Sequence, residues 1–309
     1  MTRAKPIFPG QLWFITVRCQ QRRFRLRPRR WLRHLLEYLL AVGAERFGVR
    51  LVAMYVASNH YHLVLEDLDG RLPDFTQWFN SLVARFVNVK QAESDSVWTP
   101  AGPDCALLAD PDAVEAKIVY ALANPVKDGL VAHGREWLGL RTRPQDFWQP
   151  PRVVSRPAAF FREGGPLPDK ATLRWHVPSS HAGMSPTEFG QRIAAQLGDA
   201  EAKYRAQLAS AGRKPIGARR AAAVDYDARP QTDEPHGPGT VPSEVIARDP
   251  TARRSLVQRV DHFRDAYVAA QSEWRAGNRL VLWPSGTWQM HRHHGVLLHP
   301  PPAIAVGPN

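Results

Sequence analysis

Residues 49–66 read VRLVAMYVASNHYHLVLE, two runs of aliphatic, β-branched and aromatic residues on either side of a Ser-Asn pair. This pattern predicts a β-hairpin with a two-residue turn. In its second strand His60 and His62 are two positions apart, so they share one face of the sheet and Tyr61 points to the other. A lone His-x-His pair usually lies on a solvated strand face. The flanking sequence decides whether this pair has a function.

The segments on either side of the hairpin predict further strands and helices. Apolar spacing and β-branched runs predict a strand at 12–19, helices at 27–48 and 72–91, a strand at 105–109, and a helix that begins at Pro111 after an Asp110 N-cap. The order is β-α-β-β-α-β followed by one more helix, which predicts an α+β fold with a ferredoxin-like antiparallel sheet. One face of that sheet packs on two helices. We expect the other face to be free for a ligand.

The last of these helices lies in DPDAVEAKIVYALANPV, residues 110–126. Its buried stripe is predicted from apolar residues spaced by four: Val114, Ile118 and Leu122. Tyr120 and Asn124 lie one turn apart on a different face, together with Lys117. Because Pro125 follows, we expect the helix to end near Asn124 and this polar face to be exposed. A tyrosine at the edge of a core is the ordinary interpretation, and a reacting hydroxyl is the alternative.

The charge of the chain indicates a polyanionic partner. There are 41 Lys and Arg against 29 Asp and Glu, a formal net charge of +12. Eight arginines fall within sixteen residues: Arg18, Arg22, Arg23, Arg25, Arg27, Arg29, Arg30 and Arg33. The planar guanidinium fork suits phosphate oxygens, so a nucleic-acid surface is predicted here.

Several classes of protein are disfavoured by the composition. No apolar run approaches the roughly 20 residues that span a bilayer, and no secretory signal is visible, so we expect no membrane partner. Cys19 and Cys105 give neither a disulfide framework nor zinc spacing. We therefore expect a reduced, cytoplasmic and nucleoid-associated protein.

Two motifs carry a resemblance to a known family. SNHYHLVL (58–65) resembles the His-hydrophobe-His motif of single-strand DNA endonucleases, and YALANPVKDGLV (120–131) resembles the Tyr-x-x-x-Asn-Pro-Val-x-x-Gly-Leu-Val signature of REP-associated tyrosine transposases. These are insertion-sequence transposases that move single strands with one tyrosine. The resemblance covers roughly residues 5–145.

The resemblance implies a role for each motif residue. His60 and His62 would hold a divalent cation, Mg²⁺ or Mn²⁺, and Asn124 would complete the metal site. Tyr120, on an added nucleophile helix, would attack a phosphodiester and leave a 5′-phosphotyrosine and a free 3′-hydroxyl. Tyr55 is the rival nucleophile, because the register that sets its face cannot be fixed from the sequence.

Predicted DNA contacts come from the arginine-rich segment and the nucleophile helix: Arg18, Arg22, Arg23, Arg25 and Lys117. The expected partner is single-stranded or hairpin DNA, bound by a monomer or a homodimer. A terminal HRHH (residues 291–294) lacks a second ligand cluster at metal spacing. We interpret it as a basic strand face rather than a metal site.

The chain is predicted to divide into a transposase/nuclease domain at 1–145, a Pro/Arg-rich joint with a strand at 146–184, and a mixed extension at 185–309. Ser185 and Glu188 form a predicted capping box for a long helix, and a Pro/Gly-rich linker lies near 224–245. Two functions remain open: a metal-dependent single-strand DNA endonuclease and strand-transferase acting at hairpin-forming repeats, or a catalytically lapsed, domesticated nucleic-acid-binding protein of the same fold.

Overall fold

The computed structural model describes residues 4–158, 160–162, 164–230 and 244–300. Up to residue 127 the main elements run in the predicted order: β1 (Gln11–Arg18), α1 (Arg30–Phe47), β2 (Val49–Val56), β3 (His60–Asp67), α2 (Leu72–Gln91), β4 (Asp104–Leu108) and α3 (Pro111–Lys127), with a short η1 (Gln20–Arg22) after β1. The predicted α+β class and the β-α-β-β-α-β order are confirmed.

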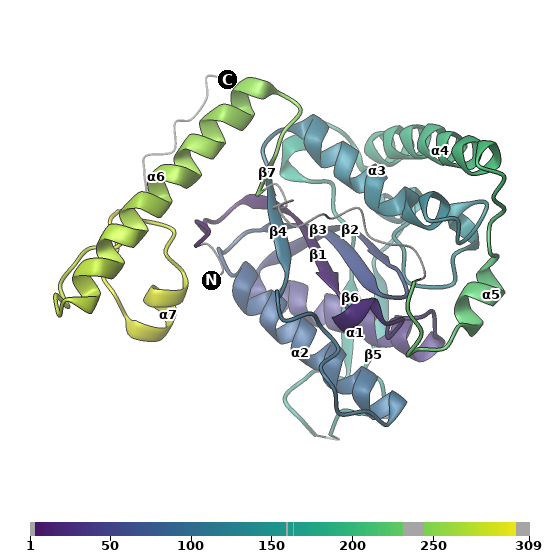
Figure 1. Cartoon of the computed structure of the whole chain (residues 1–309), viewed down its shortest axis with the longest axis horizontal. Helices are drawn as coiled ribbons and strands as arrows, with labels where there is room; N and C mark the ends of the chain where they lie inside the picture. The colour runs from purple at the N-terminus through teal and green to yellow at the C-terminus, as the bar shows by residue number, and fades with distance from the viewer. Residues whose placement is uncertain (1–3, 159, 163, 231–243, 301–309) are drawn as a thin grey trace.

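The strands form one mixed sheet in the order β2-β3-β1-β4-β7 (Figure 1). The first four strands pair antiparallel, as the ferredoxin-like prediction requires. The edge strand β7 (Val245–Ile246) comes from the C-terminal part of the chain and pairs parallel to β4. The predicted sheet therefore gains an edge strand that the sequence analysis did not anticipate.

Local sequence signals explain where α1 and α3 begin and end. Gly48 follows α1 with φ of 61°, a left-handed conformation that glycine adopts without a Cβ penalty. Asp110 caps α3, because its carboxylate accepts a hydrogen bond from the Ala113 amide at 2.7 Å.

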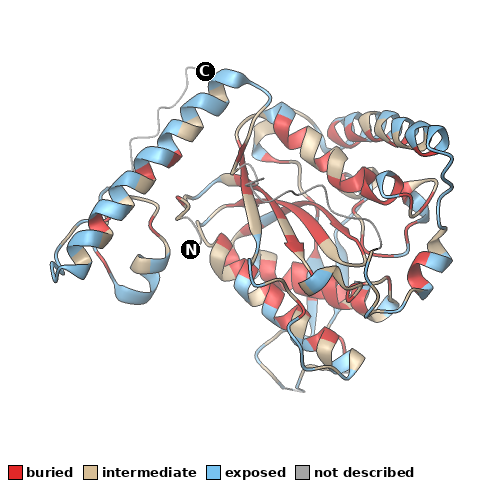
Figure 2. Ribbon diagram, viewed as in Figure 1, coloured by how far each residue is buried: buried red, intermediate tan, exposed pale blue. Residues whose placement is uncertain are grey.

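Helices α1 and α2 cover one face of the sheet, and buried residues line their inner sides (Figure 2). Tyr61 points to this face, as predicted. Its ring is 1% exposed and packs edge-on against Phe79 of α2. Its hydroxyl donates to Asn80 Oδ1 at 2.7 Å. This strand parity places His60 and His62 on the opposite face.

The opposite face is not free, which corrects the sequence-based expectation. Helix α3 packs across it, and α4 (Pro186–Ser210) packs on α3 in turn. Figure 1 shows α3 lying over the sheet with α4 beside it. The expectation failed because the strand and helix patterns predict that α3 exists but not that it folds back across the sheet.

Helix α3 also extends past Pro125 to Lys127, three residues beyond the predicted end. Proline lacks only its own N–H, so the helix loses a single hydrogen bond to the preceding turn. The Pro125 carbonyl then accepts hydrogen bonds from the amides of Leu130 and Val131, at 2.9 and 3.2 Å.

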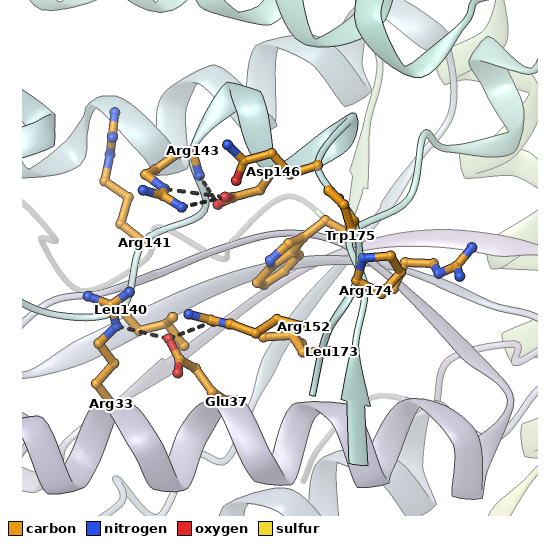
Figure 3. A pocket seen from close by; sticks show the side chains of 13 residues that line it. Arg33, Glu37, Leu140, Arg141, Arg143, Asp146, Arg152, Leu173, Arg174 and Trp175 are labelled. Atoms are coloured by element: carbon orange, nitrogen blue, oxygen red, sulfur yellow. Dashed lines mark hydrogen bonds and ion pairs between the residues drawn. The ribbon is translucent and has the colours of Figure 1, made fainter. Parts of the chain in front are cut away.

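The chain after α3 runs along the edge of β2 that faces away from β3, where Leu140, Thr142 and His176 form hydrogen bonds with its backbone. It contains η2 (Gly134–Glu136) and η3 (Pro144–Phe147), and the joint predicted at 146–184 contains β5 (Arg152–Ser155), β6 (Lys170–Leu173) and η4 (Ser179–His181). One strand was predicted here, and the structure has an antiparallel pair. A cavity of about 400 Å³ opens between this joint and α1 (Figure 3). Glu37 on its floor accepts hydrogen bonds from Arg33 and Arg152, so the joint is tied to α1 by charge.

The extension continues with α4, α5 (Ala218–Ala223), α6 (Pro250–Arg275) and α7 (Gln289–His294). The Ser185 and Glu188 capping box is confirmed, with both reciprocal hydrogen bonds present. His291, Arg292, His293 and His294 form part of the short helix α7, so the predicted strand face at this position is wrong.

The proposed division at residues 145 and 185 stays a prediction. Of the linker predicted near 224–245, residues 231–243 lie outside the described part of the chain. Residues 224–230 contact the N-terminal half, and residue 245 joins the sheet. Within the described ranges, no helix is long and apolar enough to cross a bilayer.

Candidate active site and nucleic-acid interface

The histidine pair lies on the α3 side of the inner strand β3. The imidazole centroids of His60 and His62 are 4.8 Å apart, with ring planes at 67°. In the ladder, Arg18 of β1 lies opposite His60, and Thr16 lies opposite His62. His62 is only 5% exposed, whereas His60 is half-buried at the start of the strand. The predicted side-by-side arrangement of the two rings is present.

Both histidines are oriented through one ring nitrogen. His60 Nδ1 lies 2.8 Å from Asn59 Oδ1, and His62 Nδ1 lies 2.9 Å from the Thr16 hydroxyl. An amide oxygen only accepts hydrogen bonds, so His60 Nδ1 carries the proton. This contact leaves Nε2 as the nitrogen available for coordination. An imidazole held through Nδ1 by an oxygen partner is the usual arrangement around a metal-binding histidine.

Burial keeps both imidazoles neutral. It lowers the pKa of His60 to about 4, with further lowering by Arg18 and Lys127. Burial also lowers the pKa of His62 well below its usual value, and the neighbouring His60, Lys117, Lys127 and Arg18 lower it further. Neutral imidazoles keep the lone pair that a cation requires.

Tyr120 lies against this pair. Its ring centroid is 5.4 Å from that of His62 and 6.1 Å from that of Phe14, and Phe14 stacks on His62 at 5.1 Å. Lys127 Nζ donates a hydrogen bond to the Tyr120 hydroxyl at 3.2 Å, and Lys117 Nζ lies 5.0 Å from the Tyr120 ring centroid. The structure thus brings Tyr120, His62 and Lys117 together across two motifs.

Phe14 and Lys127 are site residues that the sequence analysis missed. Lys127 lies seven positions after Tyr120, which is two helical turns and so the same face, a spacing that could have identified it. Phe14 shares strand parity with Thr16, but only the β1–β3 register places both beside His62.

Asn124 departs from the sequence-based expectation. Its side chain is 2% exposed rather than on an open polar face. Nδ2 makes a long 3.4 Å contact with the Tyr120 carbonyl one turn earlier. The burial arises because α3 is enclosed between the sheet and α4. A buried amide can still supply a carbonyl oxygen to a cation, so its role as a ligand stays a prediction.

Tyr55 is on the histidine face, a question that the sequence left open. It lies opposite His62 in the β2–β3 ladder, and its ring centroid is 6.3 Å from that of His60. The ring is fully buried, and its hydroxyl has no hydrogen-bond partner. Burial raises the pKa of Tyr55 well above its usual value, with a further increase from Asp128. A phenol in this position is a poor nucleophile.

A cavity of about 360 Å³ adjoins this cluster on the β4 side, lined by Phe14, Asp104, Lys117, Ile246 and Arg253, among others. Tyr120 also lines a groove of about 620 Å³ between α3 and α4, which includes Arg192 and Arg248. Tyr120 therefore lies between two openings that carry basic side chains.

Most of the arginine-rich segment is covered. Residues 222–229, here called the acidic strap because they include Asp225 and Asp227, lie on it. Arg23 pairs with Asp227 at 2.9 Å. Arg25 is 2% exposed and donates to Asn88 Oδ1 at 2.9 Å. The predicted phosphate contact by Arg25 is therefore not available in this conformation.

The other predicted DNA contacts differ in position. Arg18 and Lys117 lie at the histidine cluster. Arg22 lies in η1 at the edge of the strap-covered surface, with φ of 59°. The sequence analysis treated the arginines as one surface, whereas the structure separates Arg18 from the rest.

The donor set fits a divalent cation in part. His60 and His62 present two neutral imidazoles, with the Asn124 amide as the predicted third ligand. Among the described residues, no group of three or more His, Cys, Asp or Glu side chains could hold a metal. Magnesium prefers oxygen ligands, so a site of this composition suits Mn²⁺ better.

Comparison with known proteins gives limited similarity. No family model matches the chain, and no curated protein matches its sequence. Among solved structures it is similar to a REP-associated tyrosine transposase bound to a REP hairpin, with 17% identity over 44% of this chain and 79% of that one and a TM-score of 0.37. A candidate transposase from Deinococcus radiodurans has 18% identity over 40% of this chain and 97% of that one, with a TM-score of 0.27.

A tRNA(His) guanylyltransferase from Saccharomyces cerevisiae is also similar, with 9% identity over 69% of this chain and 82% of that one and a TM-score of 0.31. The family that the two sequence motifs resemble is therefore represented among the similar structures. At this level of similarity the comparisons do not assign an activity to this chain.

Proposed function

We propose that the chain is a metal-dependent single-strand DNA endonuclease and strand-transferase that acts at hairpin-forming repeats with Tyr120 as its nucleophile. The observation that carries the proposal is the meeting of the two motifs. Tyr120 of α3 contacts His62 of β3, ring centroids 5.4 Å apart, and His60 lies beside His62. If Tyr120 and His62 had only separate structural roles, the two motifs would have no reason to meet at one place.

The proposed reaction is a transesterification. The Tyr120 oxygen attacks the phosphorus of a phosphodiester, the bond from phosphorus to the 3′ oxygen breaks, and that oxygen leaves as a 3′-hydroxyl after taking a proton. The DNA is then joined to Tyr120 through its 5′-phosphate, and a second hydroxyl can reverse the step on another strand. A divalent cation bound at His60 and His62 would polarise the scissile phosphate.

The basic side chains around Tyr120 have distinct parts in this proposal. Lys127 donates to the Tyr120 hydroxyl and supplies a positive charge where the phenolate forms. Arg18 and Lys117 lie at the histidine pair and would hold the phosphate against it. Phe14 stacks on His62 and lines the adjoining cavity, so an unpaired base entering that cavity would meet its ring once Lys117 moves off it.

The test is covalent capture. We would incubate the protein with Mn²⁺ and labelled hairpin DNA that carries single-stranded flanks, then look for a denaturant-resistant adduct. Wild type is expected to form it, and Tyr120→Phe, which removes only the hydroxyl, is expected to lose it. Tyr55→Phe is the matched control, because that hydroxyl makes no hydrogen bond. An adduct retained in Tyr120→Phe, or one mapped to Tyr55, would overturn the assignment.

One observation favours a second function, a binding protein whose chemistry has lapsed. His62 is 5% exposed beneath Phe14 and Tyr120, so a metal and a phosphate reach it only if these rings shift. Under this alternative, hairpin DNA binds but no adduct forms in wild type at any concentration of Mn²⁺. The capture experiment therefore separates the two functions.

A further inference from the structure

The acidic strap, residues 222–229, covers the arginine-rich segment with contacts suited to a strand of nucleic acid. Its backbone carbonyls accept hydrogen bonds from two guanidinium groups: Arg27 Nη1 to Val224 O at 2.7 Å, and Arg29 Nη1 to Ala222 O at 2.8 Å. The Phe24 amide donates to the Ala228 carbonyl at 3.0 Å. The strap is thus fixed on this surface by hydrogen bonds along its length.

One aromatic ring of the strap, that of Tyr226, lies beside two cations. The guanidinium carbons of Arg25 and Arg27 are 5.6 and 5.3 Å from the centroid of the Tyr226 ring. The Tyr226 hydroxyl donates to Glu93 Oε1 at 3.2 Å. Asp227, next in the chain, pairs with Arg23 at 2.9 Å. A flat ring beside arginines with an anion next to it is also the way in which a nucleotide is bound by basic proteins.

The strap leaves two guanidinium N–H groups of the surface beneath it without hydrogen-bond acceptors. The Nε–H groups of Arg23 and Arg25 are buried and have no hydrogen-bond acceptor. A small cavity of about 30 Å³ lies beside them, lined by Gln20, Asp95 and others. Buried donors without acceptors are costly, and the cavity beside them, lined by η1 and the loop at Asp95 rather than by the strap, has room for one acceptor oxygen.

The charge balance agrees with this. The strap supplies the carboxylates Asp225 and Asp227 but also Arg229, whose guanidinium donates to Gln21 Oε1. Against it stand Arg23, Arg25, Arg27 and Arg29, of which Arg23 also lies 3.8 Å from Asp95. Burial and repulsion by Arg29 lower the pKa of Arg27, and Asp225 offsets this in part. A phosphate backbone would neutralise them more fully than the strap does.

We propose that the segment Arg23–Arg29 is a binding surface for a single DNA strand, and that the acidic strap is an internal competitor which occupies it until the strand displaces it. The proposal deepens the proposed function and rests on its nucleic-acid partner, but it does not require the chemistry at Tyr120. In the bound state, phosphates take the place of Asp227 and the strap carbonyls, and a base takes the place of Tyr226.

Binding in chelator tests the proposal separately from catalysis. The affinity of the full-length protein for a labelled oligothymidylate would be measured by fluorescence anisotropy with EDTA present. Tyr226→Ala changes no charge and removes the ring, so it is expected to tighten binding by about tenfold. Asp227→Asn is expected to tighten it as well. Its matched control is Asp265→Asn, an exposed acid on α6 that removes the same charge and is expected to leave affinity unchanged.

Hydrogen exchange in the wild-type protein provides a readout that needs no variant. Saturating oligothymidylate is expected to speed exchange of the strap amides at 222–229 and to slow exchange at 23–29. Unchanged affinity in Tyr226→Ala and Asp227→Asn, or a strap that stays protected when DNA is bound, would overturn the proposal. A loss of adduct formation in the capture experiment would not affect it.

Discussion

Lys127 Nζ lies 3.2 Å from the hydroxyl oxygen of Tyr120 and 4.4 Å from the centroid of its ring. Lys117 Nζ, by contrast, lies over the ring, 5.0 Å from its centroid. A cation bonded to the attacking oxygen stabilises negative charge as it develops there, and a cation over the ring does so less.

Lys127→Met should therefore slow adduct formation by about 10- to 100-fold at saturating Mn²⁺. The decisive measurement is the single-turnover rate. Lys117→Met is the control and should reduce DNA affinity more than this rate. Equal rates for wild type and Lys127→Met would remove the lysine from the mechanism.

The hydrogen bond between Thr16 and His62 gives a prediction on metal affinity. Thr16→Val keeps the shape of the side chain but leaves His62 Nδ1 without its oxygen partner. Loss of such a contact typically weakens metal binding by roughly 10-fold or more. The Mn²⁺ concentration that gives half-maximal adduct should rise by that factor, whereas the maximal yield should change little.

His60→Ala and His62→Ala remove ligands outright and should abolish the adduct while hairpin affinity is retained. Excess chelator should have the same effect on wild type. Cleavage that persists in chelator, or in either variant, would contradict the metal assignment.

The accuracy of the sequence-based predictions follows the range of the interactions involved. The hairpin, the Gly48 helix end, the Asp110 cap and the Ser185 capping box depend on residues within a few positions of one another, and all are present. The prediction that Tyr61 points to the opposite face of the sheet from the histidines followed from strand parity alone.

The predictions that failed concern contacts between distant parts of the chain. Asn124 was expected on an exposed face and is buried, because α3 is enclosed between the sheet and α4, which docks from more than sixty residues away. Arg25 was expected at the surface and lies beneath the strap. The face of Tyr55 required the register of β2 against β3, which the turn sequence alone did not fix.

Glu37 of α1 forms an ion pair with Arg152 of the joint (Figure 3), and this contact gives a prediction on stability. Its carboxylate is 10% exposed and pairs with Arg33 Nε at 2.8 Å and Arg152 Nη2 at 2.9 Å. Since both guanidinium groups are about half exposed and regain water, Glu37→Gln should cost only about 1–2 kcal/mol in the free energy of unfolding.

Chemical denaturation would measure this loss. Asp74→Asn is the control, because its contact with Arg71 at 3.4 Å joins residues only three apart at the start of α2. That change should cost under about 1 kcal/mol. If Glu37→Gln lowers the free energy of unfolding no more than the control does, the ion pair contributes nothing to the attachment of the joint.

The recessed position of the histidines predicts which form of DNA is cleaved. His62 is 5% exposed beneath Phe14 and Tyr120, and the adjoining cavity of about 360 Å³ has room for a nucleotide but not a double helix. A flexible single strand can enter and place a base on Phe14, whereas a duplex holds its phosphates outside. The enzyme should therefore cut single strands that flank a hairpin and leave perfect duplex intact.

Four basic side chains lie near the path of the strand into this cavity: Arg18, Lys117, Lys127 and Arg253. If each contacts one phosphate, these four side chains should contribute about −3 to the slope of log affinity against log salt for a single strand, in addition to any contribution from Arg23–Arg29. Lys117→Met should reduce the magnitude of that slope by about 0.7. Anisotropy titrations with Tyr120→Phe, from low to high salt, would measure both slopes without cleavage. Cleavage of duplex at the rate of flanked single strand, or a slope near zero, would show that the strand does not pass through this site.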